Sequence, residues 1–241
     1  MARQVYNWSM LTREMLFNML NLIQGEIVGK KLTVNEFHAT ISKHIKQHLP
    51  VRTIMDRDVE TLSGYVYVGG YYYSHLDRKK NKPIAILFSY HLFDEHVKIT
   101  RYKWLRICSL FADTLLHEII HMRQFRARNF KDIPGYQSTA ERAKQRKDQS
   151  YFGDKDELGA YAFNIACELY DRFGTDFDAA KKYLDSNQVK RHKRTSLYRY
   201  MKVFDWNHSH PVIKSLKSKI TRNLPYAQIG KPFRTTNYLT F

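Results

Sequence analysis

One short motif constrains the fold of this chain more than any other feature. Residues 117–121 have the pattern HExxH, with His117, Glu118 and His121 at its fixed positions. Apolar periodicity predicts a long helix over 103–128, and four residues along a helix return to nearly the same side. Both imidazoles therefore leave one face, one turn apart, where they can bind one metal ion. Glu118 lies about 100° further round and can approach a metal-bound water without being a ligand.

The chemistry of the motif favours Zn²⁺ and requires a third protein ligand. Zinc held by two histidines and one carboxylate keeps an open position for a water molecule, whose proton Glu118 can accept. Gln124 and Ala127 stand where the extended metzincin pattern has Gly and His, which excludes that class. Glu157, in the first turn of a helix predicted over 156–173, is the first candidate. The other candidates are Glu141, His208 and His210.

Two further roles near the metal have candidates. Hydrolysis of a peptide needs a hydrogen-bond donor for the developing oxyanion. Tyr161 is the first choice because it follows Glu157 by one helical turn, and Tyr151, His208 and His210 are the alternatives. Asp113, one turn before His117, could orient the free ring nitrogen of that histidine.

His117, Glu118 and His121, followed by Glu157 in a Glu-x-x-Ala setting, resemble the site of a gluzincin-type zinc metallopeptidase. Segment 157–160 is similar to the second ligand helix of the ImmA/IrrE-like peptidases. The resemblance covers residues 83–170 and implies a zincin-like fold, a Zn²⁺ cofactor and a protein or peptide substrate. It also implies a substrate that adds as a strand beside the strand predicted over 83–90.

The basic character of the chain is similar to that of SprT-like proteases, which act on DNA-bound proteins, although their downstream histidine signature is absent here. Arg123 stands where such motifs usually have an apolar residue. The unusual flanking sequence favours a divergent, phage-encoded protein, for which a virion-associated location is the alternative to the cytoplasm.

Hydrophobic patterning predicts an α+β fold that is predominantly helical, with a small antiparallel sheet beside a central HExxH helix. Helices are expected near both ends of the chain and strands in between. Residues 129–153 are expected to form a polar surface excursion, and Gly69-Gly70 to mark a bulge or hairpin in the first strand. The expected helices cover 11–25, 33–49, 176–186, 194–204 and 211–223, and the expected strands cover 64–73, 83–90 and 97–100.

A single zincin-like domain over 1–241 is the predicted organisation, because no linker rich in Gly, Ser or Pro divides the chain. Its expected parts are N-terminal helices (1–62), the sheet with both ligand helices (63–173), basic C-terminal helices (174–224) and an extended tail (225–241).

The composition of the chain indicates its cellular location. The sequence is 43% hydrophobic, yet no apolar run reaches the roughly 18 residues of a membrane-spanning helix. Residues 15–23 lack the features of a signal peptide. Cys108 and Cys167, both in apolar patterns, are expected to be buried free thiols. These features predict a cytoplasmic protein with no membrane partner.

Charge suggests a second kind of partner. The chain carries a formal net charge of +17, and residues 189–222 contain ten basic groups against one acid, Asp205. Such a surface attracts nucleic acid or acidic proteins. The alternative function is therefore a catalytically silent zincin scaffold that binds these partners through 189–222. Helical periodicity predicts a partial basic patch, because these apolar residues must face inward: Val189, Leu197, Tyr198, Met201, Val203, Phe204, Val212, Ile213, Leu216 and Ile220.

Overall fold

The structure is a computed structural model that describes residues 8–79, 81–193 and 195–228. The chain divides into two compact units, Met1–Phe130 and Lys131–Phe241. The boundary falls inside the region 63–173 that the sequence assigns to one part of a single domain. The expected tail begins at the 3-10 helix η3 (Tyr226–Gln228), and its remainder lies outside the described residues.

The first unit contains the sheet and the HExxH helix. Its elements in chain order are η1 (Trp8–Met10), α1 (Arg13–Asn21), α2 (Gln24–Ile27), β1 (Lys31–Thr33), α3 (Val34–His48), β2 (Arg52–Asp58), β3 (Val66–Tyr72), α4 (Ser74–Arg78), β4 (Ile84–His91), β5 (His96–Lys98) and α5 (Arg101–Ala127).

The described part of the second unit is helical. Its elements are α6 (Ala143–Gly153), α7 (Lys155–Phe173), α8 (Phe177–Leu184), η2 (Asn187–Arg191), α9 (Ser196–Val203), α10 (Pro211–Asn223) and η3. The molecule is thus α+β and mostly helical with a small sheet, which confirms the coarse class. Among the described helices, none is long and apolar enough to cross a membrane.

The main sheet differs from the antiparallel sheet expected. It has three strands in the order β2-β4-β3, with β2 parallel and β3 antiparallel to β4. Strand β2 lies in the region predicted to hold only N-terminal helices. Its sequence, RTIMDRD, lacks the apolar run of a typical strand. Such a sequence is compatible with β2 because this strand lies at the edge of the sheet, where polar residues are tolerated. Strand β5, expected in the same sheet, pairs instead with β1 in a separate two-stranded sheet.

The prediction of a bulge or hairpin at Gly69-Gly70 is wrong. Strand β3 pairs with β4 in one unbroken register, from Val66 opposite Tyr90 to Tyr72 opposite Ile84. Side chains of β3 alternate between the two faces. Val66 and Val68 are buried, whereas Tyr67 and Tyr71 are 55% and 50% exposed.

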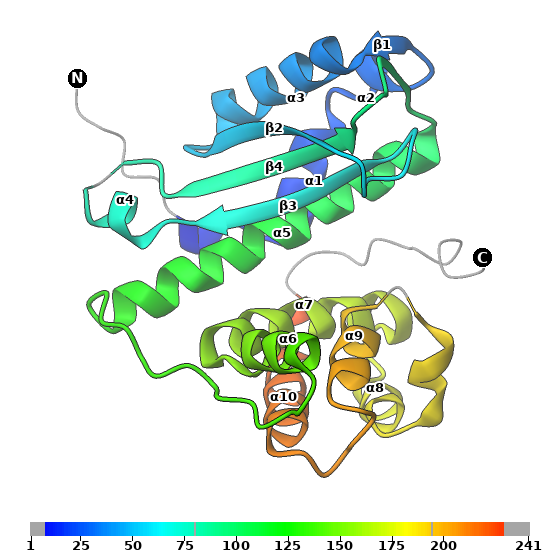
Figure 1. Ribbon diagram of the computed structural model, residues 1–241. Coiled ribbons are helices and arrows are strands. Elements are labelled where there is room, and N and C mark those ends of the chain that lie inside the picture. The colour runs from blue at the N-terminus through cyan, green and yellow to red at the C-terminus, as the bar shows by residue number, and fades with distance from the viewer. Residues whose placement is uncertain (1–7, 80, 194, 229–241) are drawn as a thin grey trace. The chain divides into compact units, whose positions relative to one another are not determined.

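One face of the sheet is covered by helices α5 and α3 (Figure 1). Tyr72 of β3 meets Phe125 of α5 with ring centroids 5.4 Å apart. Phe37 of α3 meets Tyr90 of β4 at 6.1 Å. Burying such rings stabilises the unit by roughly 1.5–3 kcal/mol per large side chain, which holds α5 firmly along the sheet.

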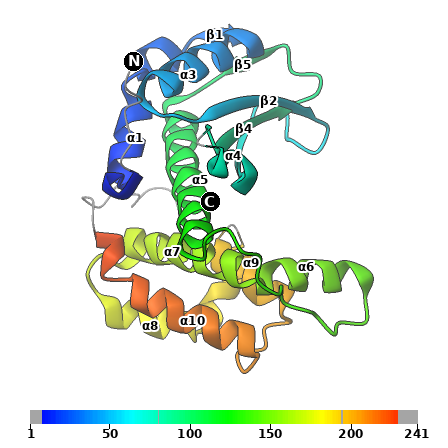
Figure 2. The same cartoon turned by 90° about the vertical axis from the view of Figure 1, so that its left-hand side faces the viewer.

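Local capping sets where the helices of this unit begin. Helix α3 begins with a capping box, in which the Thr33 side chain accepts from the Glu36 amide and the Glu36 carboxylate accepts from the Thr33 amide. Thr100 caps α5 by accepting from the Lys103 amide. Helix α1 packs along α5 (Figure 2).

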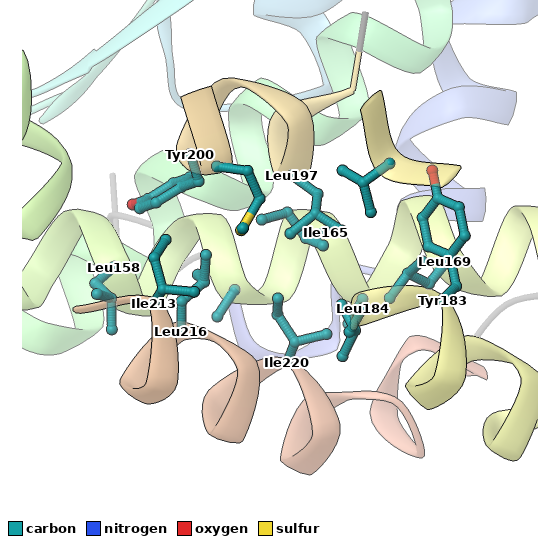
Figure 3. Close-up of a cluster of buried hydrophobic side chains, with 14 of the residues drawn as sticks. Leu158, Ile165, Leu169, Tyr183, Leu184, Leu197, Tyr200, Ile213, Leu216 and Ile220 are labelled. Carbon is teal, nitrogen blue, oxygen red and sulfur yellow. The ribbon is translucent and has the colours of Figure 1, made fainter. Parts of the chain in front are cut away.

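The second unit is built around α7, with α9 and α10 packed on opposite sides of it (Figure 3). The apolar residues expected to face inward do so: eight of them are buried, and Tyr198 and Val203 are partly buried against the same core. The segment 129–153 is not a simple excursion, because it ends in helix α6. Phe152 of α6 belongs to this core. Its burial could not be predicted from the sequence, because most of the other residues of α6 are polar.

Candidate metal centre

The HExxH residues lie in the buried middle of α5, as the sequence predicts. His117, Glu118 and His121 are only 8%, 7% and 8% exposed. Burying three polar side chains on one helix is unfavourable unless each has a partner or a function. Their burial therefore marks this part of α5 as a candidate site.

The two histidines converge on one point. Their Nε2 atoms are 3.0 Å apart, and their ring centroids are separated by 4.7 Å. Two nitrogens at about 2.1 Å from a tetrahedral zinc ion lie about 3.4 Å apart, so a small ring rotation brings both into coordination distance.

Gln124 fixes the second imidazole. The Nδ1 atom of His121 lies 3.1 Å from the Gln124 side-chain oxygen, which accepts a hydrogen bond from it. That hydrogen bond selects the tautomer whose Nε2 lone pair faces His117. The sequence identifies Gln124 only as a departure from the metzincin pattern. Its spacing of three residues from His121 is the signal that could have revealed this role.

Gly70 of β3 is a site residue that the sequence analysis missed. A Cβ atom placed on Gly70 would lie 2.8 Å from Cγ and 2.9 Å from Oε1 of Glu118, and 2.7 Å from Cγ2 of Thr114. The absence of a side chain at this position thus lets the Glu118 carboxylate lie directly against the strand. No local pattern predicts this, because the contact joins residues 48 positions apart in the chain.

Other charged groups on α5 anchor it to its neighbours. Asp113, the candidate for orienting His117, accepts from Nε and Nη2 of Arg13 on α1 at 2.5 and 3.1 Å. Arg126 makes a bidentate ion pair with the buried Asp77 of α4. The role of Asp113 toward His117 stays a prediction, and its contact with Arg13 is structural.

In the second unit, Glu157 lies in the first turn of α7, as expected. Asp154 caps this helix by accepting from the Asp156 amide at 2.8 Å. Tyr161, one turn later, is half-buried, with its ring 5.6 Å from Phe152 and 5.4 Å from Tyr200.

The alternative third ligands have other surroundings. Glu141 is exposed just before α6. His210 caps α10, since its Nδ1 accepts from the Val212 amide, and Lys217 donates to Nδ1 of His208. These contacts give His208 and His210 a structural role around α10.

The basic residues of 189–222 divide between two surfaces. The buried side chains of α9 and α10 point toward α7 from opposite sides, so their exposed sides face away from each other (Figure 3). The η2–α9 surface consists of Lys190, Arg191, Lys193, Arg199 and Lys202, all exposed. The α10 surface consists of Lys214, Lys219 and Arg222, whereas Lys217 of the same helix donates to Asp185. Arg194 lies outside the described residues.

Comparison with known proteins adds no assignment: no family model, curated protein or solved structure matches this chain. The functional argument therefore depends on the residues of the site.

Proposed function

We propose that this protein is a zinc-dependent metallopeptidase of the gluzincin type, with a zincin-like fold. The observation that carries the proposal is the buried pair of imidazoles on α5, with Nε2 atoms 3.0 Å apart and Glu118 beside them. A protein that used this helix only for packing would have no need of Glu118. The combination of two potential ligands and an adjacent carboxylate supports hydrolysis.

The donor set fits zinc. In this proposal, His117 and His121 of the first unit and Glu157 of the second unit are the three protein ligands. Two nitrogens and one carboxylate oxygen are the ligands of catalytic zinc in many peptidases. When bound, the ion would lower the pKa of a coordinated water and polarise the substrate carbonyl.

Glu118 performs the proton transfers in this proposal. Its carboxylate accepts a proton from the attacking water and delivers it to the nitrogen of the leaving amine. Burial of Glu118 in the packed face of α5 keeps bulk water from competing for that proton. Tyr161 remains the proposed donor to the oxyanion.

The strand expected to pair with the substrate is not the one that the sheet leaves open. The resemblance assigns substrate addition to the strand over 83–90, but β4 occupies the centre of the sheet and has neighbours on both sides. Strand β3 is the edge strand that packs against α5. Because an extended peptide pairs only with a free edge, we propose that substrate adds along β3.

The test of the ligand set is metal content. Purified protein dialysed against chelator-treated buffer should retain about one Zn²⁺ per chain. The variants His117→Ala and Glu157→Ala should lose most of it, because two remaining ligands bind weakly. His208→Ala, which removes a histidine from the α10 terminus, is the control and should retain zinc.

Equal zinc content in His117→Ala and the parent protein would exclude this site. Loss in His117→Ala with retention in Glu157→Ala would keep the imidazole pair and assign the third ligand elsewhere, with Glu141 as the next candidate.

A second candidate function is polyanion binding by the η2–α9 surface. Its five exposed cations lie within 13 residues, and the surface also carries two aromatic rings. Lys190 lies 5.1 Å from the Trp206 ring, which packs against Tyr198. On the α10 side, by contrast, Lys217 is paired with Asp185.

We expect labelled DNA to bind without sequence preference, with an affinity that falls steeply as salt rises. Reversing Lys190, Arg191 and Arg199 to Glu should weaken binding at low salt and reduce the salt slope by about three. The matched reversal of Lys214, Lys219 and Arg222 should have a smaller effect. Absence of binding at low salt, or equal effects of both triple variants, would contradict this surface and favour an acidic protein partner.

A further inference from the structure

The two edges of the main sheet differ in how well they are protected against pairing with another strand. Strand β2, at one edge, has the sequence RTIMDRD, in which four of seven residues are charged. Strand β3, at the other edge, has the sequence VYVGGYY, which contains no charged residue and no proline. Natural proteins usually place such residues on exposed edges, because an edge without them pairs readily with an extended chain. The sequence of β3 therefore favours pairing with an added strand.

Strand β3 presents different side chains on its two faces. On one face, Gly70 lies against Glu118 of α5, and the strand runs along this helix (Figure 1). Because side chains alternate along a strand, Tyr67 and Tyr71 lie on the other face. Their side chains are 55% and 50% exposed there. One strand thus joins the proposed catalytic carboxylate on one face to two solvent-exposed rings on the other.

Tyr67 and Tyr71 have further apolar neighbours on this face. Gly69 lies between them, and its partner in the register is Leu87 of β4, which is only partly buried. A Cβ atom on Gly69 would lie 3.3 Å from Cε1 of Tyr67 and 3.9 Å from Cβ and Cδ2 of Leu87. The rings of Tyr71 and Tyr73 have centroids 6.2 Å apart. Aromatic and aliphatic groups therefore line this part of the sheet surface.

An added strand would place its side chains in a fixed relation to these residues. The residue opposite Gly70 has its side chain on the α5 face, beside Glu118, and its two neighbours have theirs on the other face. One neighbour is opposite Gly69, between the rings of Tyr67 and Tyr71, and the other is directly opposite Tyr71. Directly opposed Cβ atoms lie about 4.5–5.5 Å apart, and aromatic and β-branched side chains pair favourably with a ring at this distance.

We propose that Tyr67 and Tyr71 determine the substrate specificity of this protein: they bind an aromatic or β-branched side chain of an extended peptide, next to the residue held beside Glu118. This inference rests on the proposed peptidase function, with substrate added along β3, and it names the substrate class. A charged side chain at that position would lose hydration without gaining a partner from β3, which has no charged residue.

The test is the binding of dye-labelled, eight-residue peptides to the full chain, measured by fluorescence anisotropy. All measurements use a Glu118→Gln background, so that a bound peptide is not cleaved. A peptide that alternates Phe with Ser should bind about fivefold or more tightly than one that alternates Ala with Ser. Tyr67→Thr combined with Tyr71→Thr removes both rings and keeps the β propensity of the strand, so it should reduce this preference below about twofold.

Two controls accompany this variant. Met55→Thr removes a side chain that is 42% exposed on the other edge strand, and it should keep the preference of the parent protein. Tyr67→Phe combined with Tyr71→Phe keeps both rings and should also keep it. Unchanged thermal unfolding will confirm that each variant is folded.

Equal binding of the Phe and Ala peptides would overturn the inference, as would an unchanged preference in the double Thr variant or its loss in the double Phe variant. Tighter binding of a peptide with Lys in place of Phe would overturn the proposed substrate class.

Cleavage by the zinc-loaded parent protein is a separate readout. Aromatic and β-branched residues should be enriched next to the bonds cleaved in casein, and cleavage without this enrichment would contradict the role of the tyrosines alone. A binding preference without any cleavage would instead contradict the peptidase proposal and leave the peptide-binding role of Tyr67 and Tyr71 supported, so the two failures are distinguishable.

Discussion

Glu118→Gln is expected to leave zinc content unchanged and to lower peptide hydrolysis by about 10²- to 10⁴-fold. The substitution removes the proton acceptor and keeps the shape of the side chain. Shape matters here because Cγ and Oε1 of Glu118 lie against Gly70, where a larger group would not fit. The measurement combines metal analysis with the rate of cleavage of fluorescently labelled casein by the zinc-loaded protein.

Glu26→Gln is the control for this experiment, because it makes the same change of charge at an exposed position of the same unit. It should cleave at the parent rate. Equal cleavage by Glu118→Gln and the parent protein would contradict the peptidase proposal. Loss of zinc in Glu118→Gln would instead show that this side chain is a ligand or supports the fold of the site.

Gly70→Ala is expected to abolish most of the hydrolysis while the histidine pair still binds zinc. The new Cβ would lie within 2.9 Å of Cγ and Oε1 of Glu118, closer than such atoms approach in real proteins. The carboxylate must therefore move away from the strand, and overpacking should lower the free energy of unfolding by about 1–3 kcal/mol. Cleavage rate, metal content and thermal unfolding together measure these effects.

The neighbouring glycine supplies the matched control. A Cβ on Gly69 would lie 3.3 Å from the Tyr67 ring, whose exposed side chain can shift. Gly69→Ala should therefore keep most of the activity. Adding Thr114→Ser to Gly70→Ala removes the Cγ2 clash, so it should recover stability but not hydrolysis. Parent-like activity in Gly70→Ala, or equal loss in both alanine variants, would contradict the role of this contact.

Local geometry explains which features could be predicted from the sequence. The position of the imidazole pair follows from helical periodicity, and α5 and α7 lie close to their predicted ranges. The capping box at Thr33 and Glu36 was predictable because all its hydrogen bonds join residues three apart. The inward faces of α9 and α10 were predictable for the same reason, since apolar spacing alone defines them.

Strand pairing could not be predicted in this way. Strand β2 pairs in parallel with β4, and this pairing joins segments more than 30 residues apart. Its polar sequence is compatible with an edge and also with a loop. As a result, the prediction of an antiparallel sheet was wrong, and so was the choice of β4 as the strand open to substrate.

The sequence by itself determined the pair of histidines, the neighbouring glutamate and the candidate carboxylate of the next long helix, because each depends on spacing along one helix. Tertiary structure alone decided that β3 forms the edge beside α5 and that Gly70 makes room for Glu118. The physical reason is that a helix fixes the directions of its own side chains every few residues. Contacts between elements depend instead on how whole surfaces pack, and no short segment contains that information.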